Sequence, residues 1–194
     1  MASRKPKTVA YRRKREGKTN YKKRLKLLLA QTNRVVVRFT QTQVIGQVVS
    51  FEPKGDRVIV SNNSLNLKKL GWNYSYKNVP ASYLAGFELG KKALAKGIKK
   101  AILDTGFKSP LKKSKTYAFL KGVLDAGVQI PNKSEDIFPS QDRIEGKHIE
   151  VYADKLKSND VAFNKQFSKY LKNKAQLTGI SAKFNEVKQK IESA

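Results

Sequence analysis

The first 26 residues carry twelve Lys and Arg side chains and a single acid, Glu16. Before Leu25 this basic segment holds almost no apolar side chain that could be buried. Packing therefore cannot offset the entropy lost when the segment is ordered, so it stays mobile unless a strongly negative partner orders it. The formal net charge of the whole chain is +26. We therefore expect a polyanionic partner, and nucleic acid is the commonest polyanion.

The positive charge is concentrated in two blocks. Residues 1–26 carry a net charge of +11 and residues 91–121 one of +9, whereas residues 27–90 between them carry +4. Residues 122–153 are acidic, with −3, and residues 154–194 carry +5. The lysine-rich surface of a thermophilic protein would instead combine scattered Lys with matching Glu. The two blocks indicate two separate segments that bind anions.

Length and composition limit the class of protein. With 194 residues, the chain is one ordinary domain with extensions or two small domains. It has no cysteine, which excludes disulfides and thiolate chemistry and fits a reducing cytoplasm. No apolar run reaches the roughly 18–20 residues that span a bilayer, and no signal-peptide core is present. Pro6 and Gly17 argue against a mitochondrial transit peptide, so we expect a cytoplasmic protein without a membrane partner.

Hydrophobic periodicity predicts a short helix followed by three strands. The helix is expected at residues 20–31, with Asn20 as its N-cap. Strands are expected at residues 34–40, 43–51 and 57–62, and their short connections make them an antiparallel meander. Along the first two strands apolar side chains alternate with Arg and Gln, which is typical of a sheet whose helices cover only one face.

The pattern in the second half of the chain predicts several helices and one more strand. A helix opening at Pro80 carries Gly86 and Gly90, which would let it lie close on the sheet. The segments expected beyond it are a strand at residues 100–104, apolar enough to be central, a helix at 116–126, a loop at 131–149, a helix capped by Asn159 or Asp160, and a last helix that Gly179 starts.

This order predicts an α/β (α+β) fold. We expect a mixed sheet in which a three-strand antiparallel meander is followed by helix, strand and helix, with the helices packed on one face. We divide the chain into a basic arm with its helix at residues 1–32, a mixed α/β core at 33–153 and a helical C-terminal extension at 154–194. No internal repeat of 20–50 residues is visible.

The same order of elements occurs in nucleases of the ribonuclease H type, which hold two metal ions between carboxylates. The first strand should then supply an acid, but residues 34–40 contain none, and Asp104 at a strand end reads as a turn residue. His148 is the only histidine, and one His without Cys makes a poor metal site. The acidic stretch at 135–150 reads as a solvated loop. We therefore expect no catalytic residue, no metal, no cofactor and no small-molecule substrate.

The basic segment and the lysine loop (residues 108–115) are expected to contact phosphates. Tyr11 and Tyr21 flank the arm cations and are placed to stack on unpaired bases. Stacking and burial in a core are equally supported for Trp72. A localisation signal or a non-specific tether is the alternative for the arm. That alternative is weaker because the arm continues into a helix and a sheet with an Arg/Gln face.

Several motifs resemble one family of ribosomal proteins. They stand in order over about residues 8–153. They are Arg12-Arg-Lys-Arg-Glu-Gly-Lys-Thr-Asn-Tyr-Lys-Lys-Arg-Leu-Lys-Leu-Leu28, Asn33-Arg-Val-Val-Val-Arg-Phe39, Ile45-Gly-Gln-Val-Val49, Gly71-Trp72, Pro80-Ala-Ser-Tyr-Leu-Ala-Gly86, Ala101-Ile-Leu-Asp-Thr-Gly106, Ser114-Lys115, Asp125-Ala-Gly-Val-Gln-Ile-Pro131 and Arg143-Ile-Glu-Gly-Lys-His-Ile149. The chain resembles the 5S-rRNA-binding protein of the large ribosomal subunit, universal family eighteen, in its archaeal and eukaryotic form, and more closely the archaeal one.

The resemblance implies a structural constituent of the ribosome rather than an enzyme. Its expected partners are 5S rRNA, which it would anchor to 23S rRNA in the central protuberance, and neighbouring large-subunit proteins including the other 5S-binding protein. The candidate RNA-binding residues are Arg4, Lys5, Lys7, Tyr11, Arg12, Arg13, Lys14, Arg15, Lys18, Thr19, Asn20, Tyr21, Lys22, Lys23, Arg24, Arg34, Arg38, Gln43, Gln47, Trp72, Lys108, Lys112, Lys113 and Lys115. The alternative is a general nucleic-acid-binding or RNA-chaperone protein without preference for 5S rRNA.

Overall fold

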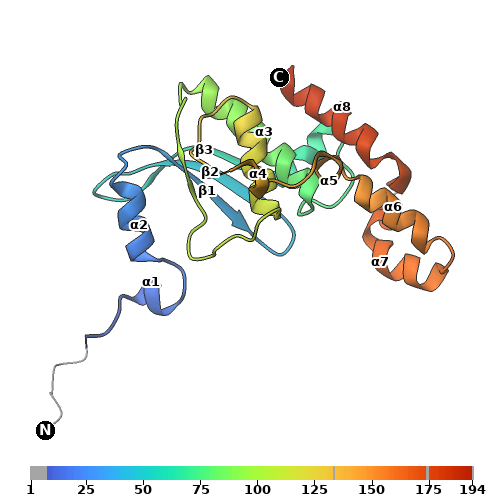
Figure 1. Cartoon of the computed structure of the whole chain (residues 1–194), viewed down its shortest axis with the longest axis horizontal. Helices are drawn as coiled ribbons and strands as arrows, with labels where there is room; N and C mark the ends of the chain where they lie inside the picture. The colour runs from blue at the N-terminus through green and yellow to red at the C-terminus, as the bar shows by residue number, and fades with distance from the viewer. Residues whose placement is uncertain (1–7, 133, 174, 194) are drawn as a thin grey trace, which may run out of the picture.

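A four-stranded mixed sheet forms the centre of the computed structural model, which describes residues 8–132, 134–173 and 175–193 (Figure 1). Its strands are β1 (Arg34–Phe39), β2 (Val44–Ser50), β3 (Arg57–Asn63) and β4 (Ile102–Asp104). The order across the sheet is β3-β2-β1-β4. The first three strands are antiparallel, because short turns join them, and β4 runs parallel to β1 after a helical crossover. This confirms the predicted mixed sheet and its meander.

One expectation for the sheet was wrong. β4 was expected to be central because its side chains are apolar, but it is a three-residue strand at the edge beside β1. Beyond β4 lies only an isolated parallel bridge between Lys100 and Gln129. Ile102 and Leu103 are half-buried rather than enclosed, so apolar composition alone did not distinguish an edge position from a central one.

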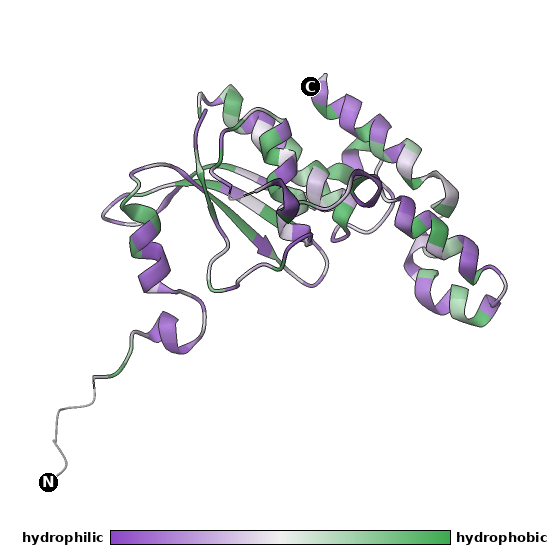
Figure 2. Ribbon diagram, viewed as in Figure 1, coloured by the Kyte–Doolittle hydropathy of each residue, from purple (hydrophilic) through white to green (hydrophobic). Residues whose placement is uncertain are grey.

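Two helices, α3 (Val79–Ala95) and α4 (Lys115–Asp125), cover one face of the sheet. Val35, Val37 and Val48 point into this layer and share a buried cluster with Leu89 and Phe119. Figure 2 shows green, apolar stretches along the strands, in contrast to the purple α1. Helices α3 and α4 therefore lie on one face only, as the strand alternation predicts, and most of the opposite face stays available to solvent or a partner.

The glycines of α3 serve a contact between helices rather than one with the sheet. A Cβ on Gly86 would lie 2.1 Å from the backbone oxygen of Phe119 in α4, and one on Gly90 would lie 2.5 Å from the Cβ of Ala126. Gly122 of α4 faces α3 in the same way, 2.2 Å from the oxygen of Tyr83. The expectation that Gly86 and Gly90 let α3 approach the sheet is therefore corrected: they let α3 and α4 pack backbone to backbone.

Replacing Gly86 by Ala is expected to destabilise the protein by about 1–3 kcal/mol. Ala favours a helix interior over Gly by about 1 kcal/mol, but the clash with a backbone oxygen forces the helices apart and outweighs this gain. Urea unfolding measures the difference. Gly179→Ala is the control, because its new Cβ would lie 4.0 Å from the Tyr74 hydroxyl and would meet nothing closer outside its own segment. A stability equal to or above that of the wild type would contradict the close packing.

A second buried cluster joins the middle of the chain to its C-terminus. Trp72 is fully buried and donates its indole N–H to the Ser75 carbonyl at 3.2 Å. Tyr74, its neighbour in an edge-to-face contact, is also buried. The same cluster holds Ile180 and Phe184 of the last helix. Trp72 is thus a core residue, and its predicted stacking on RNA bases is withdrawn because no face of its ring reaches solvent.

The C-terminal half is more helical than the sequence indicates. Residues 131–149, expected as a loop, contain two short helices and the start of a longer one. The elements from residue 64 onward that are not yet named are η1 (Ser64–Leu70), η2 (Glu135–Ile137), α5 (Gln141–Glu145), α6 (Lys147–Leu156), α7 (Asp160–Lys172), η3 (Leu177–Gly179) and α8 (Ile180–Glu192). Asn159 caps α7 through its side chain, as predicted. The boundary that we drew after residue 153 falls inside α6.

The arm forms two helices, α1 (Arg12–Arg15) and α2 (Tyr21–Leu28), at the opposite end of the molecule from α6 and α7 (Figure 1). Asn20 is the N-cap of α2 and accepts the backbone N–H of Lys23 at 3.0 Å, as predicted. Leu25 and Leu29 stay outside, 62% and 74% exposed, whereas Leu27 and Leu28 are half-buried. Within the described residues, no helix is long and apolar enough to cross a membrane.

Candidate nucleic-acid interface

A concavity of about 1400 Å³ opens on the face of the sheet that α3 and α4 leave uncovered. The arm forms one wall, the sheet forms the floor and the loop after β4 forms the other wall. We call it the open groove. Among the residues that line it are Arg13, Lys18, Tyr21, Lys23 and Arg24 of the arm, Arg34, Val36, Arg38, Gln47, Val49 and Val58 of the sheet, and Thr105, Phe107, Lys108 and Leu111 of the loop.

The alternation of side chains along β1 and β2 builds the floor of the groove. Inward residues of these strands meet α3 and α4, so the intervening ones point the other way. Arg38 is exposed there and Gln47 is half-buried beside it. Arg38 offers the planar donor array that suits phosphate and Gln47 an amide that can donate or accept. The floor therefore mixes polar and apolar side chains, since Gln47 lies directly opposite Val36 in the strand register.

The groove is strongly cationic. Seven Lys and Arg side chains line it against two acids, Asp56 and Asp104. Both acids are already paired with arginines that belong to the lining. Because their charge is neutralised locally, the remaining cations set the potential of the groove, and that potential attracts polyanions. A positive potential attracts an acidic protein surface as well as nucleic acid, so charge alone does not distinguish the two partners.

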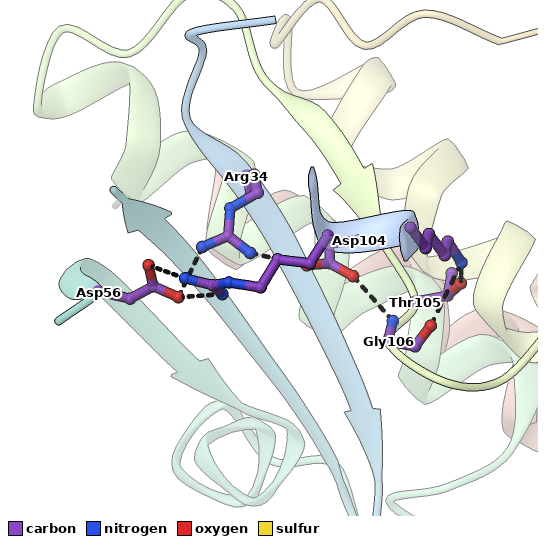
Figure 3. Close-up of polar contacts among 7 residues, drawn as sticks. Arg34, Asp56, Asp104, Thr105 and Gly106 are labelled. Carbon is purple, nitrogen blue, oxygen red and sulfur yellow. Dashed lines mark hydrogen bonds and ion pairs between the residues drawn. The ribbon is translucent and has the colours of Figure 1, made fainter. Parts of the chain in front are cut away.

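A chain of ion pairs crosses the uncovered face beneath α2 (Figure 3). Arg24 binds both oxygens of Asp56, at 2.6 and 2.7 Å. The same carboxylate accepts from Arg34 at 2.6 Å, and Arg34 donates its other nitrogen to Asp104 at 2.8 Å. Asp104 then accepts the backbone N–H of Gly106 at 2.8 Å. One continuous network thus connects the arm, β1, the turn before β3 and the end of β4.

Arg34 is the centre of this network and is only 2% exposed. A guanidinium taken out of water is tolerated where carboxylates pair with it, and Arg34 has two of them. Its predicted contact with RNA is therefore corrected: the side chain lies on the polar face, as the alternation predicts, but it is buried and both terminal nitrogens bond to carboxylates inside the protein. Asp104 is confirmed as a turn residue through Gly106 and has a second role, as a partner of Arg34, that the sequence did not indicate.

The arginines hold the pKa of the Asp56 carboxyl at about 2, below its ordinary value of 3.8, chiefly through the hydrogen bond from Arg24. The pKa of Arg24 is raised by the same hydrogen bond. Because the folded-state pKa of Asp56 is depressed, its ionised form stabilises the folded state above about pH 4. That contribution is lost as the pH falls through about 2.

A second polar contact fixes α2 on the other side of the groove. The ammonium of Lys23 donates to the Thr105 hydroxyl at 2.6 Å and lies 3.4 Å from the Gly106 carbonyl. Thr105 in turn donates to the carbonyl of Lys108, at the start of the lysine loop. Lys23 and Arg24 therefore attach one helix to two loops that follow different strands.

The lysine loop gathers cations next to the groove. Lys112 and Lys113 share one exposed acid, Asp136, at 2.9 and 3.4 Å, and pairs of this exposed kind contribute little stability. Desolvation, and then repulsion from Lys77, lowers the pKa of Lys115. An anion bound beside Lys115 would offset both the desolvation of its ammonium and the repulsion from Lys77.

The structure sorts the candidate residues by their access to solvent. Arg4, Lys5 and Lys7 lie outside the described residues. The exposed ones are Tyr11, Arg12, Arg13, Lys14, Arg15, Lys18, Asn20, Tyr21, Lys22, Arg38, Lys108, Lys112, Lys113 and Lys115, the half-buried ones are Thr19, Lys23, Arg24, Gln43 and Gln47, and the buried ones are Arg34 and Trp72. The rings of Tyr11 and Tyr21 lie 5.2 Å apart, centre to centre, at the outer end of the arm. The exposed set is thus divided between the arm, the floor and the lysine loop.

Asp56 is the groove residue that the sequence analysis passed over. It lies in the short connection between the strands predicted at 43–51 and 57–62, and it was given no role there. A signal was present, since Glu52, Asp56 and Glu88 are the only acids among residues 27–90. Among the described residues, no group of three His, Cys, Asp or Glu side chains could hold a metal ion, and His148 is exposed.

Comparisons with known proteins agree with one another. Residues 5–99 match a family model described as ribosomal large subunit proteins 60S L5 and 50S L18. The chain is 44% identical to the large ribosomal subunit protein uL18 of Sulfurisphaera tokodaii, over 95% of this chain and 94% of that one. It is 46% identical to the protein of the same name from Thermofilum pendens, over 96% and 95% of the two chains.

Proposed function

We propose, from the premise that this chain belongs to the uL18 family of large ribosomal subunit proteins, that it binds 5S rRNA through the open groove and the lysine loop. The family membership makes the chain a structural constituent of the ribosome and not an enzyme. We further propose that it anchors 5S rRNA to 23S rRNA in the central protuberance.

The observation that carries the proposal is the open groove itself. It combines exposed cations on both walls with a floor of apolar and hydrogen-bonding side chains. Cations on the walls suit the phosphates of an RNA strand, and release of counterions supplies much of the affinity. A shaped floor between them favours one RNA shape over others, because RNA is recognised largely by shape and unstacked bases.

The two tyrosines at the outer end of the arm support contact with unpaired bases. Tyr11 is 74% exposed and Tyr21 is 37% exposed, and neither packs into the cores. Exposed aromatic rings among cations are typical of surfaces that stack bases. We propose that these rings lie against nucleotides of 5S rRNA or the adjoining 23S rRNA.

The surface of α6 and α7 suits a protein neighbour better than RNA. It exposes Val151, Tyr152 and Val161, which are 54%, 47% and 81% accessible. The charge around them is mixed, since Asp154 pairs with Lys157 at 2.7 Å, so the exposed apolar side chains are the feature that suits a protein partner. We propose that a neighbouring large-subunit protein, such as the other 5S-binding protein, contacts this part of the chain.

The proposal is tested by comparing 5S rRNA with an unrelated RNA of the same length. Filter binding at about 0.15 M salt is expected to give an affinity for 5S rRNA at least about a hundredfold higher, within the range that separates specific from non-specific nucleic-acid binding. Raising the salt should weaken both complexes, but the difference should remain. Equal affinities would instead support a general nucleic-acid-binding or RNA-chaperone protein.

A further inference from the structure

The two acids of the open groove are unexpected on a surface that binds RNA. Each carboxylate there repels phosphate and cancels a cation that could attract it. Asp56 nevertheless lies where it pairs with Arg24, an arm residue, and with Arg34 of the sheet. A charge that opposes binding is retained where its effect on structure outweighs its repulsion, so the question is what Asp56 holds in place.

Helix α2 has little apolar attachment. None of its residues is fully buried, Leu25 points into solvent, and the half-buried Leu27 and Leu28 belong to none of the buried clusters. The polar side-chain contacts that join α2 to the core are the bidentate pair of Arg24 with Asp56 and the bond of Lys23 to Thr105. An isolated helix of eight residues is marginal in water. The order of α2 therefore depends on these polar contacts.

We propose that Asp56 is a positioning residue for RNA binding: by holding Arg24, it docks the basic arm on the sheet before RNA arrives. We call the Arg24–Asp56 pair the latch. With the latch closed, Arg13 and Lys18 stand at the groove in the arrangement that the RNA meets. Asp56 then raises the affinity for RNA although its own charge repels phosphate. This inference rests on the proposed function, because it assumes that RNA occupies the groove.

The geometry favours Arg24 as a latch rather than as a direct phosphate contact. Both of its terminal nitrogens are engaged by one carboxylate, and the fork of a guanidinium matches a carboxylate in this bidentate way. Arg34 fixes the carboxylate from the other side at 2.6 Å. Asp56 is therefore held in place for Arg24, and Arg24 would have to leave it in order to reach a phosphate.

The two roles of Asp56 predict opposite changes in RNA affinity for the substitution Asp56→Asn. If Asp56 is only an adverse charge beside a phosphate contact, Asp56→Asn strengthens RNA binding. If it closes the latch, Asp56→Asn weakens binding, because the arm is docked in only a fraction of the molecules. A docked fraction that falls to about one tenth raises the apparent Kd for 5S rRNA about tenfold. Glu52→Gln is the matched control: it removes one charge from the same turn, where Glu52 has only a distant pair with Arg57 at 3.9 Å, and should leave Kd unchanged or slightly lower.

A double-mutant cycle with Arg24→Gln completes the test. If the pair is a latch, Asp56→Asn and Arg24→Gln each weaken RNA binding about tenfold. The double variant then binds RNA no more weakly than the single variant with the lower affinity. With a direct phosphate contact, Arg24→Gln weakens binding and Asp56→Asn strengthens it. Asp56→Glu keeps the carboxylate and should recover part of the affinity. Tighter binding by Asp56→Asn than by the wild type would overturn the proposal.

Amide hydrogen exchange without RNA separates the latch from the proposed function. Exchange of the α2 amides should be at least about tenfold faster in Asp56→Asn and in Arg24→Gln, while exchange in α3 stays at the wild-type rate. Arg24→Gln leaves the Arg34–Asp56 pair intact, so it keeps the test valid if Asp56→Asn impairs folding. Unchanged α2 exchange in Arg24→Gln would also overturn the latch. If the wild type binds 5S and unrelated RNA equally, the 5S specificity fails, and the exchange result still decides the latch.

Discussion

Deleting residues 1–19 is expected to lower the affinity for 5S rRNA by about a hundredfold or more at 0.15 M salt. The deletion removes eight Lys and Arg side chains and one acid. For each phosphate that the shortened arm no longer touches, the plot of log affinity against log salt should also become flatter by about 0.7–0.9. Titrations at several salt concentrations measure both quantities. An unchanged slope would show that these cations do not touch phosphate in the complex.

A matched pair of variants separates the position of the charge from its amount. One variant replaces four arm cations, Arg12, Arg13, Lys14 and Arg15, by Gln. The other replaces four exposed lysines of α6 and α7 by Gln, and these are Lys155, Lys157, Lys165 and Lys169. Both variants have the same net charge, so a general polyelectrolyte attraction would weaken equally in both. We expect the arm variant to lose at least about ten times more affinity, because its cations lie on or beside the arm wall of the groove, where Arg13 lines it.

The attachment of the arm could not be predicted from the sequence. Asn20 was identified as a cap because capping is local, and its side chain does accept the N–H of Lys23. The latch instead joins Arg24 to an acid 32 positions away, and Arg34 joins that acid to Asp104, a further 48 positions on. Such a network follows from the strand order, and no spacing along the chain reveals it.

Periodicity predicted the sheet better than it predicted burial. The alternation along β1 correctly assigned Val35 and Val37 to one face and Arg34 and Arg38 to the other. It did not distinguish Arg38, which is exposed, from Arg34, which is buried, because the difference lies in two acids from other segments. Exposure on a polar face depends on what covers the face, and the arm covers only the end near Arg34.

The C-terminal helices show the same limit. Ile180, Phe184, Val187 and Ile191 recur at helical spacing and form the buried side of α8, and all four are at most 4% exposed. The partner of that side could not be read from spacing. It is the cluster around Trp72 and Tyr83, so residues that we assigned to a separate extension complete a core built by the middle of the chain.

Phe184→Ala is therefore expected to destabilise the whole protein by about 3–5 kcal/mol, the usual cost of removing a fully buried phenyl ring. Phe184 is 1% exposed, and its ring centre lies 5.5 Å from that of Tyr83 in α3. Urea unfolding followed by the fluorescence of Trp72 should show one transition at lower urea, since α8 and α3 share a core. Phe51→Ala is the control, because Phe51 is 51% exposed and its replacement should cost less than about 1 kcal/mol. If α8 were an independent extension, as the division after residue 153 implies, the Trp72 transition would stay where it is in the wild type.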